Sequence, residues 1–150
     1  TPAANSLAAH ALLRLAALTG EQSYADPALA IIRGLAPIAA QHPTAFACLL
    51  RAIDFVVGPT AEVAIVGALE DDNTSKLRRV LADELWPGIV TLAASPGAHQ
   101  TEPLLAGRTV VDGRSAAYVC EHFTCRLPVL TETELRDQLR DTITRDRIHP

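Results

Sequence analysis

The sequence predicts an α+β protein, with helical hairpins over residues 1–58 and a small α/β unit over residues 59–150 that holds a short, mostly parallel sheet and a C-terminal helix. Three observations predict this class. Apolar residues recur at helical spacing as far as Gly58-Pro59, a strand–helix–strand pattern follows, and a capping sequence precedes the last apolar stripe. With 150 residues, of which 49% are apolar, the chain is long enough to bury a core.

Two helices are expected first. Asn5 or Ser6 can cap a helix that runs to about Thr19, since Gly20 follows where a left-handed residue is wanted. The pair Asp26-Pro27 is typical of a second helix start, with an acidic cap and proline at the first helical position. The stretch 34–37 contains a glycine and a proline, so we expect this helix to kink or end there.

A third helix is expected to open near Pro43 and to stop at Gly58-Pro59. The period then changes to that of a strand, a helix and a second strand, which predicts a crossover between two parallel strands. These three elements are expected at about residues 62–66, 74–85 and 89–93.

The last part of the chain combines a loop, a hairpin and a helix. Residues 95–103 have the composition of a loop, and residues 109–120 resemble a hairpin around the turn Asp112-Gly113. Thr131-x-x-Glu134 is a capping box, and apolar residues at helical spacing follow it. We therefore expect a terminal helix with an exposed, charged tail.

Composition excludes several classes of protein. The net charge of -4 and the aromatic content of 4% argue against nucleic-acid binding, and basic patches interleaved with aromatics are missing. The longest apolar run, residues 7–18, is too short for a bilayer and carries charge, so no membrane partner is expected. Three cysteines are too few for a disulfide scaffold, which favours a cytoplasmic location. The absence of methionine suggests a piece of a longer protein.

Cys120-Glu-His-Phe-Thr-Cys125 is the segment richest in chemistry. Two thiols and a histidine within six residues can form a disulfide, bind a metal or exchange electrons. Zinc is not favoured, because no second close pair of ligands occurs in the sequence. Redox catalysis by Cys120 and Cys125 remains an alternative to two semi-buried thiols that close a loop after a strand.

Other patterns are less specific. Gly67 lies between a strand and a helix, but the loop lacks the further glycines of a dinucleotide site, and Glu70-Asp71-Asp72 would repel a phosphate. Adjacent acids in a turn are more often solvated than bound to magnesium. No serine occupies a Gly-x-Ser-x-Gly elbow. We therefore expect no metal, no cofactor and no identifiable catalytic residue in this chain.

Two phrases together resemble a known family. The phrase from Asn5 to Gly20 resembles a late helical hairpin of the large thioredoxin-domain-containing proteins of the YyaL type, whose animal relative is a spermatogenesis-associated thioredoxin-like protein. The phrase Ala117-Tyr118-Val119-Cys120, with Cys125 and Pro128 after it, resembles the C-terminal signature of the same family. The resemblance covers nearly the whole chain and keeps the order of its parts.

The resemblance implies a thioredoxin-like domain upstream, then an (α/α)6 toroid related to six-hairpin glycosidases, with this chain as its last helices and a small α/β cap. Any thioredoxin-like active site would then lie outside this chain. Inner toroid helices turn their ends toward the cavity, so the resemblance marks Asn5, Ser6 and His10 as candidate cavity residues. Fold analogy with glycosidases does not establish sugar chemistry.

Two hypotheses follow, and the sequence leaves open whether the parent is an enzyme. In the first, the chain is a non-catalytic C-terminal region that completes the toroid and contributes to a carbohydrate or other small-molecule pocket in the parent. In the second, the parent is a redox or sugar-modifying enzyme in which Cys120 and Cys125 act as a thiol pair. The expected partners are the remainder of the parent chain or a second copy. Either would cover apolar stripes such as Leu49, Ile53 and Val56 unless these pack within the chain.

Overall fold

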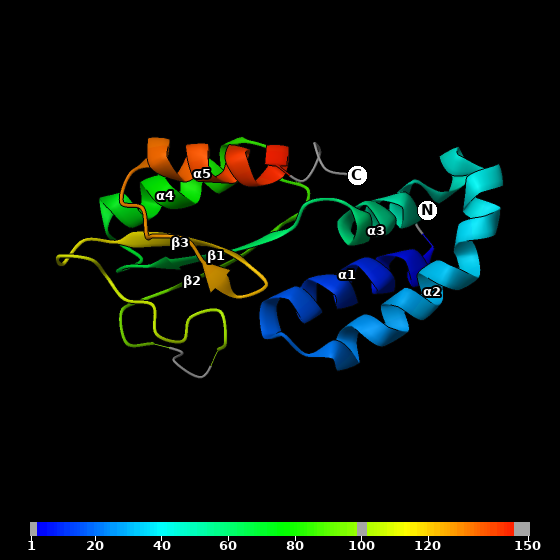
Figure 1. Ribbon diagram of the computed structural model, residues 1–150, viewed down its shortest axis with the longest axis horizontal. Helices are drawn as coiled ribbons and strands as arrows, with labels where there is room; N and C mark the ends of the chain where they lie inside the picture. Colours follow the sequence, from blue (N-terminus) through cyan, green and yellow to red (C-terminus); the bar gives the residue numbers. More distant parts are fainter. Residues whose placement is uncertain (1–2, 99–101, 146–150) are drawn as a thin grey trace. The chain divides into compact units, whose positions relative to one another are not determined.

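The computed structural model describes residues 3–98 and 102–145. The chain divides into two compact units, Thr1–Gly58 and Pro59–Pro150. The first holds helices and the second a mixed sheet with two helices, so the α+β class expected from the sequence is confirmed (Figure 1).

The helical unit consists of α1 (Ala4–Thr19), α2 (Gln22–Gln41) and α3 (Ala47–Val57), with a short 3-10 turn (Pro43–Phe46) before α3. Helix α1 starts without a side-chain cap, two to three residues earlier than capping by Asn5 or Ser6 would place it, and Gly20 ends it with φ 74° as expected. The core of this unit consists of alanine, branched aliphatic and phenylalanine side chains: Ala9, Leu13, Ala28, Ile32, Ala39, Leu49, Ala52 and Phe55.

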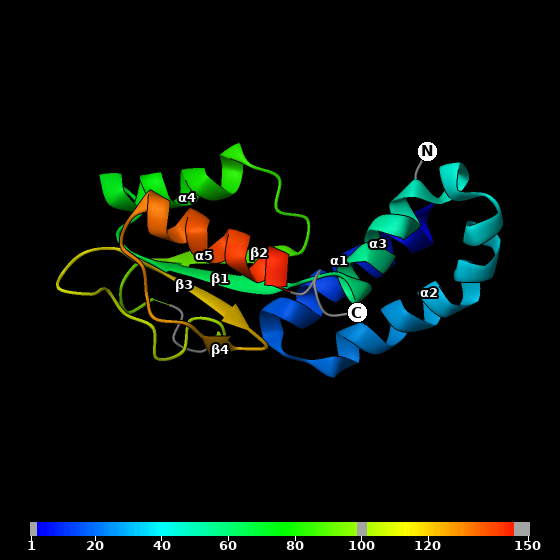
Figure 2. The same ribbon diagram turned by 45° about the horizontal axis from the view of Figure 1, so that its top comes forward.

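The expected start of the second helix at Asp26-Pro27 is wrong. Of the kink or end expected at residues 34–37, the end does not occur, but the ribbon of α2 bends in its second half (Figures 1 and 2). Helix α2 begins at Gln22 and passes through both prolines to Gln41. Each proline removes one backbone hydrogen bond, which predicts a helix boundary when sequence is taken alone. Ala28 and Ile32, one turn apart, are both buried. Their packing within the unit stabilises one continuous helix in spite of the missing bonds.

The α/β unit is built on the sheet order β2-β1-β3-β4. Strands β1 and β2 are parallel and joined through α4, as the strand–helix–strand pattern predicted. The bounds are β1 (Ala61–Val66), α4 (Asp72–Asp83), β2 (Ile89–Ala94), β3 (Ala116–Glu121), β4 (Thr124–Cys125) and α5 (Glu132–Arg145).

The sheet is mixed rather than mostly parallel, and the hairpin expected over residues 109–120 does not form. Strand β3 pairs antiparallel with β1 and with β4. Around the turn at Asp112-Gly113 the structure has a bridge between Val111 and Arg114. Strand β3 is apolar enough to pair in the middle of the sheet, where Ala117 and Val119 are fully buried. A local turn signal could not show that its partner lies fifty residues upstream.

The two faces of the sheet have different covers. Helices α4 and α5 lie on one face, and the segment between β2 and β3 lies on the other (Figures 1 and 2). Val63 and Ile65 of β1 pack with Leu77 of α4 and Leu135 of α5 in the main core. Because side chains alternate along a strand, Glu62, Ala64 and Val66 point to the other face.

Local signals near the C-terminus are confirmed. Thr131 Oγ1 accepts a bond from the Glu134 amide at 3.3 Å, and the Glu134 carboxylate accepts one from the Thr131 amide at 3.1 Å. This is the reciprocal pair of a capping box. Within the described ranges, no helix combines the length and the hydrophobicity that a bilayer span requires.

Candidate functional site

Cys120 and Cys125 are joined by a disulfide across strands β3 and β4. The two strands are linked by a tight turn in which His122 and Phe123 both have positive φ, 51° and 62°. Positive φ at both central residues defines the turn type whose twist suits a two-residue hairpin. The turn places Cys120 directly opposite Cys125, so the sulfurs that the sequence marked as a pair are brought together.

The guanidinium of Arg108 contacts this sulfur pair from the segment between β2 and β3. Its Nε and Nη2 lie 3.2 and 2.8 Å from Cys125 Sγ, and Nη2 lies 3.8 Å from Cys120 Sγ. The same group donates to the carbonyls of Phe123, Ala106 and Pro103, at 3.3, 2.6 and 3.2 Å. Three carbonyls therefore hold a fixed cation against the sulfur of Cys125.

Glu62 completes the site from strand β1. It is the cross-strand partner of Cys120, and partners in an antiparallel pair point to the same face. The residue is 5% exposed and accepts a bond from the Phe123 amide at 3.2 Å. Burial raises the pKa of the Glu62 carboxyl, although the Phe123 amide and the charge of His122 oppose this. We call Glu62, Arg108, Cys120 and Cys125 the sulfur cluster.

Sequence reasoning found the two cysteines and missed their partners. A glutamate at the start of the apolar run Glu62–Val66 is a local signal, because a charge on a buried strand needs a reason. Arg108 carries no such signal, since its approach to the sulfurs depends on the path of a long connecting segment.

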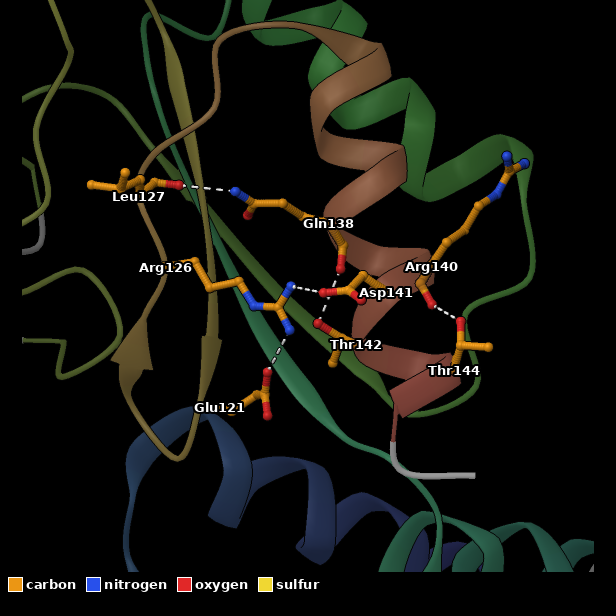
Figure 3. Close-up of polar contacts among 8 residues, drawn as sticks. All are labelled: Glu121, Arg126, Leu127, Gln138, Arg140, Asp141, Thr142 and Thr144. Carbon is orange, nitrogen blue, oxygen red and sulfur yellow. Dashed lines mark hydrogen bonds and ion pairs between the residues drawn. The ribbon is translucent and has the colours of Figure 1, made fainter. Parts of the chain in front are cut away.

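The segment after the disulfide is fixed to α5 by charged and polar contacts, as Figure 3 shows. Arg126, the next residue after Cys125, pairs with Asp141 of α5 at 2.7 Å and with Glu121 at 3.0 Å. Gln138 of α5 donates to the Leu127 carbonyl at 3.1 Å. These contacts hold β4 in place, so the position of Cys125 does not depend on the disulfide bond by itself.

Asp71 of the acidic turn makes hydrogen bonds to α4 and to Ser115. Asp71 Oδ2 caps α4 through the Thr74 amide at 3.1 Å and accepts from Ser115 Oγ at 2.6 Å. These hydrogen bonds, that of Ser115 first, lower the pKa of Asp71. Among the described residues, no group of three or more histidine, cysteine or acidic side chains is arranged to hold a metal.

The candidate cavity residues of α1 separate in the structure. Ser6 is buried and lines an open hollow of about 460 Å³ with Ala3 and residues 44–48, whereas Asn5 is exposed. The His10 ring packs edge-on against Phe55, with centroids 6.0 Å apart. Burial, with the charges of Arg51 and Arg14, lowers the pKa of His10. Of the three, Ser6 is the one that lines this hollow.

A second, smaller hollow of about 190 Å³ lies at the carboxyl ends of the parallel strands. Val66 of β1 and Ala94 of β2 line it, together with residues 95–98, Leu105 and residues 108–110. Ligands often bind at this edge of parallel sheets. Arg108 is shared between this hollow and the sulfur cluster, so the two are linked by one side chain.

The fold and the site define a two-unit α+β chain with helical hairpins, an α/β unit and a cross-strand disulfide beside a buried carboxyl. The chain is similar to spermatogenesis-associated protein 20 of human, at 27% identity over 92% of this chain, and to the rat and mouse proteins of that name, at 27% and 25% over the same share. The resemblance drawn from the sequence is thus confirmed, and it lies with the C-terminal part of those proteins.

The chain spans 18% of the length of these curated relatives. No family model matches the sequence. No solved structure matches it either.

Proposed function

We propose that this chain is the C-terminal region of a larger protein, in which the helical unit completes an α/α toroid, the α/β unit forms a cap, and neither catalyses a reaction by itself. The observation that carries the proposal is the similarity of nearly the whole chain to the C-terminal 18% of much longer relatives. The activity of the whole protein, including any carbohydrate or small-molecule pocket to which Ser6 contributes, belongs to this proposal.

Exposed apolar side chains on the helical unit support it. Leu7 is 52% exposed, Leu50 38% and Val57 76%. The stripe expected on α3 is divided: Leu49 is buried, Ile53 is half-buried, and Val56 is exposed because the buried face of α3 follows Leu49, Ala52 and Phe55. In a toroid each hairpin packs against two neighbours, so helices of the parent chain would cover the exposed side chains.

The test compares the 150-residue chain with the full-length parent. Leu7→Ser is expected to lower the opening free energy of α1, measured by hydrogen exchange, by about 1–2 kcal/mol in the parent, because a covered leucine loses its apolar contacts. The change in the chain alone is expected to stay within about 0.5 kcal/mol. Leu127→Ser, at a position 84% exposed in the α/β unit, is the matched control.

Equal effects of Leu7→Ser in both proteins would contradict the covering of this face. A second copy of the chain is the alternative cover. Sedimentation velocity of the 150-residue chain separates the two, because a homodimer predicts a concentration-dependent increase in mass that Leu7→Ser removes.

A second candidate function is thiol–disulfide exchange by Cys120 and Cys125. The observation that favours it is the disulfide itself, with the Arg108 cation held against one of its sulfurs. Titration of free thiols with and without reductant, in a Cys48→Ser background, is expected to show two further thiols after reduction and their loss on re-oxidation by glutathione disulfide. A pair that never re-forms would exclude this candidate.

A further inference from the structure

The two sulfurs of the disulfide are not equivalent. Cys120 is fully buried in β3, whereas Cys125 is partly exposed in the short edge strand β4. Arg108 also distinguishes them, with Nη2 at 2.8 Å from Cys125 Sγ and 3.8 Å from Cys120 Sγ. A cation that is closer by this much stabilises the nearer thiolate by about tenfold in population at the dielectric typical of partly exposed sites.

The buried Glu62 lies on the same face of the sheet as Cys120. The register places Glu62 directly across from Cys120, and the Phe123 amide holds the carboxylate. The charged group that acts on this carboxyl is His122 from the turn. Burial raises the pKa of this carboxyl, and the protonated form that burial favours can donate its proton to a sulfur that leaves as a thiolate.

We propose that Cys125 is the sulfur that exchanges with an external thiol, that Arg108 stabilises its thiolate, and that Glu62 transfers a proton to and from Cys120. The inference rests on the second candidate function above and assigns roles within it. Arg108 contacts Cys125 Sγ, and Glu62 is assigned as the proton donor to Cys120 Sγ.

Reduction of the disulfide takes two successive attacks by external thiolates. The thiolate of an external thiol attacks Cys125 Sγ, a mixed disulfide forms, and the bond to Cys120 breaks. The electron pair goes to Cys120 Sγ, which takes the proton of Glu62. A second external thiolate attacks the external sulfur of the mixed disulfide and releases Cys125 as a thiolate beside Arg108. Two external thiols are oxidised to one disulfide, and the protein disulfide is reduced. Of the two protons that the external thiols release, one reprotonates Glu62 and the other remains in solvent, because Cys125 is released as a thiolate.

The first experiment measures alkylation of each cysteine in the reduced, Cys48→Ser chain by iodoacetamide, followed by mass spectrometry across pH 5 to 9. Cys125 is expected to react about tenfold faster than Cys120 at pH 7, with its rate midpoint at lower pH. Arg108→Gln is expected to remove most of this advantage. Arg114→Gln, at an exposed arginine outside the cluster, is the matched control and is expected to change nothing.

The second experiment measures reduction of the disulfide by reduced glutathione as a function of pH. Glu62→Gln is expected to slow it about tenfold or more at pH 7 and to remove the acid-side dependence of the rate, while alkylation of Cys125 stays unchanged. Glu102→Gln, at an exposed glutamate, serves as the control. Circular dichroism of each variant verifies the fold.

The outcomes distinguish a failure of thiol–disulfide exchange from a failure of the roles assigned to Arg108 and Glu62. If glutathione never reduces the disulfide in the unsubstituted chain, the pair does not exchange with thiols, and this inference fails together with the second candidate function. If the pair exchanges but Glu62→Gln keeps the same pH profile, or Arg108→Gln leaves the two cysteines as unequal as before, exchange stands and the assigned roles are wrong.

Discussion

Gly67, which directly follows β1, is a position where the addition of one methyl group is expected to destabilise the fold. A Cβ there would lie 2.2 Å from Ser115 Oγ, 2.3 Å from Thr74 Oγ1 and 2.5 Å from Ser115 Cβ. Since ordinary contacts begin near 3.4 Å, each hydroxyl would have to move by about 1 Å. Thr74 is fully buried and Ser115 is 4% exposed, so neither can move into solvent.

The movement would also separate atoms that are bonded to one another. Thr74 Oγ1 and Ser115 Oγ lie 2.7 Å apart, and Ser115 donates to Asp71 at 2.6 Å. We therefore expect Gly67→Ala to lower the free energy of unfolding of the α/β unit by about 3 kcal/mol, at the upper end of overpacking effects. Adding Ser115→Gly is expected to restore part of this loss, because two of the three close contacts involve Ser115 atoms.

Urea unfolding followed by Trp86 fluorescence measures the effect, since Trp86 is the one tryptophan of the sequence and lies in the α/β unit. Gly34→Ala in α2 is the control: nothing lies within 4 Å of its new Cβ, so the helix is expected to gain about 0.5–1 kcal/mol by circular dichroism. A loss below about 0.5 kcal/mol for Gly67→Ala would refute the close packing of this loop.

Three further predictions concern caps and titrating groups. Thr131→Ala is expected to cost about 1 kcal/mol in thermal unfolding, because the capping box with Glu134 is lost, and an unchanged melting temperature would contradict it. The folded-state pKa of Glu62 is raised, so its ionisation destabilises the fold as pH rises through that value. The Glu62→Gln variant should therefore be more stable to urea than the unsubstituted chain at pH 7, and the difference should vanish below the pKa that Glu62 has in the unfolded chain. The folded-state pKa of His10 is lowered by burial and by Arg51, so its stabilising effect is present above the unfolded pKa and is lost as pH falls through the folded one. The measurement is the free energy of unfolding of the helical unit at pH 5 and pH 7. His10→Gln is expected to remove the part of the pH dependence that His10 causes.

Elements with signals in their own residues could be predicted from the sequence. The capping box, the left-handed Gly20 and the strand–helix–strand pattern each act within a few residues, and each appears as expected. The predicted helix start at Asp26-Pro27 and the possible helix end near residues 34–37 failed because burial of the α2 face outweighs two missing backbone bonds. The predicted hairpin failed because β3 finds its partner in β1, and pairing at that separation leaves no local pattern.

In the candidate site too, the parts with a local sequence signal could be predicted and the parts that depend on long-range contacts could not. The spacing of Cys120 and Cys125 fits a two-residue turn, and such a turn brings the sulfurs together. Arg108 reaches them across twelve and seventeen residues, through a segment whose composition indicates only a loop. Tyr118 helps to fix that segment, since its hydroxyl donates to the Thr109 carbonyl at 2.7 Å.

Packing of the core under α4 and α5 determines which side chains lie on the opposite face of the sheet. Val63 and Val119 are cross-strand partners in the core under α4 and α5. Because the side-chain period of a strand is two, this pairing forces the next pair, Glu62 and Cys120, onto the other face. A slip of one residue would bury the glutamate among leucines and valines and expose the apolar pair. The packing of the core is therefore enough to place Glu62 across from Cys120, and the sulfur cluster needs only Arg108 and the turn in addition.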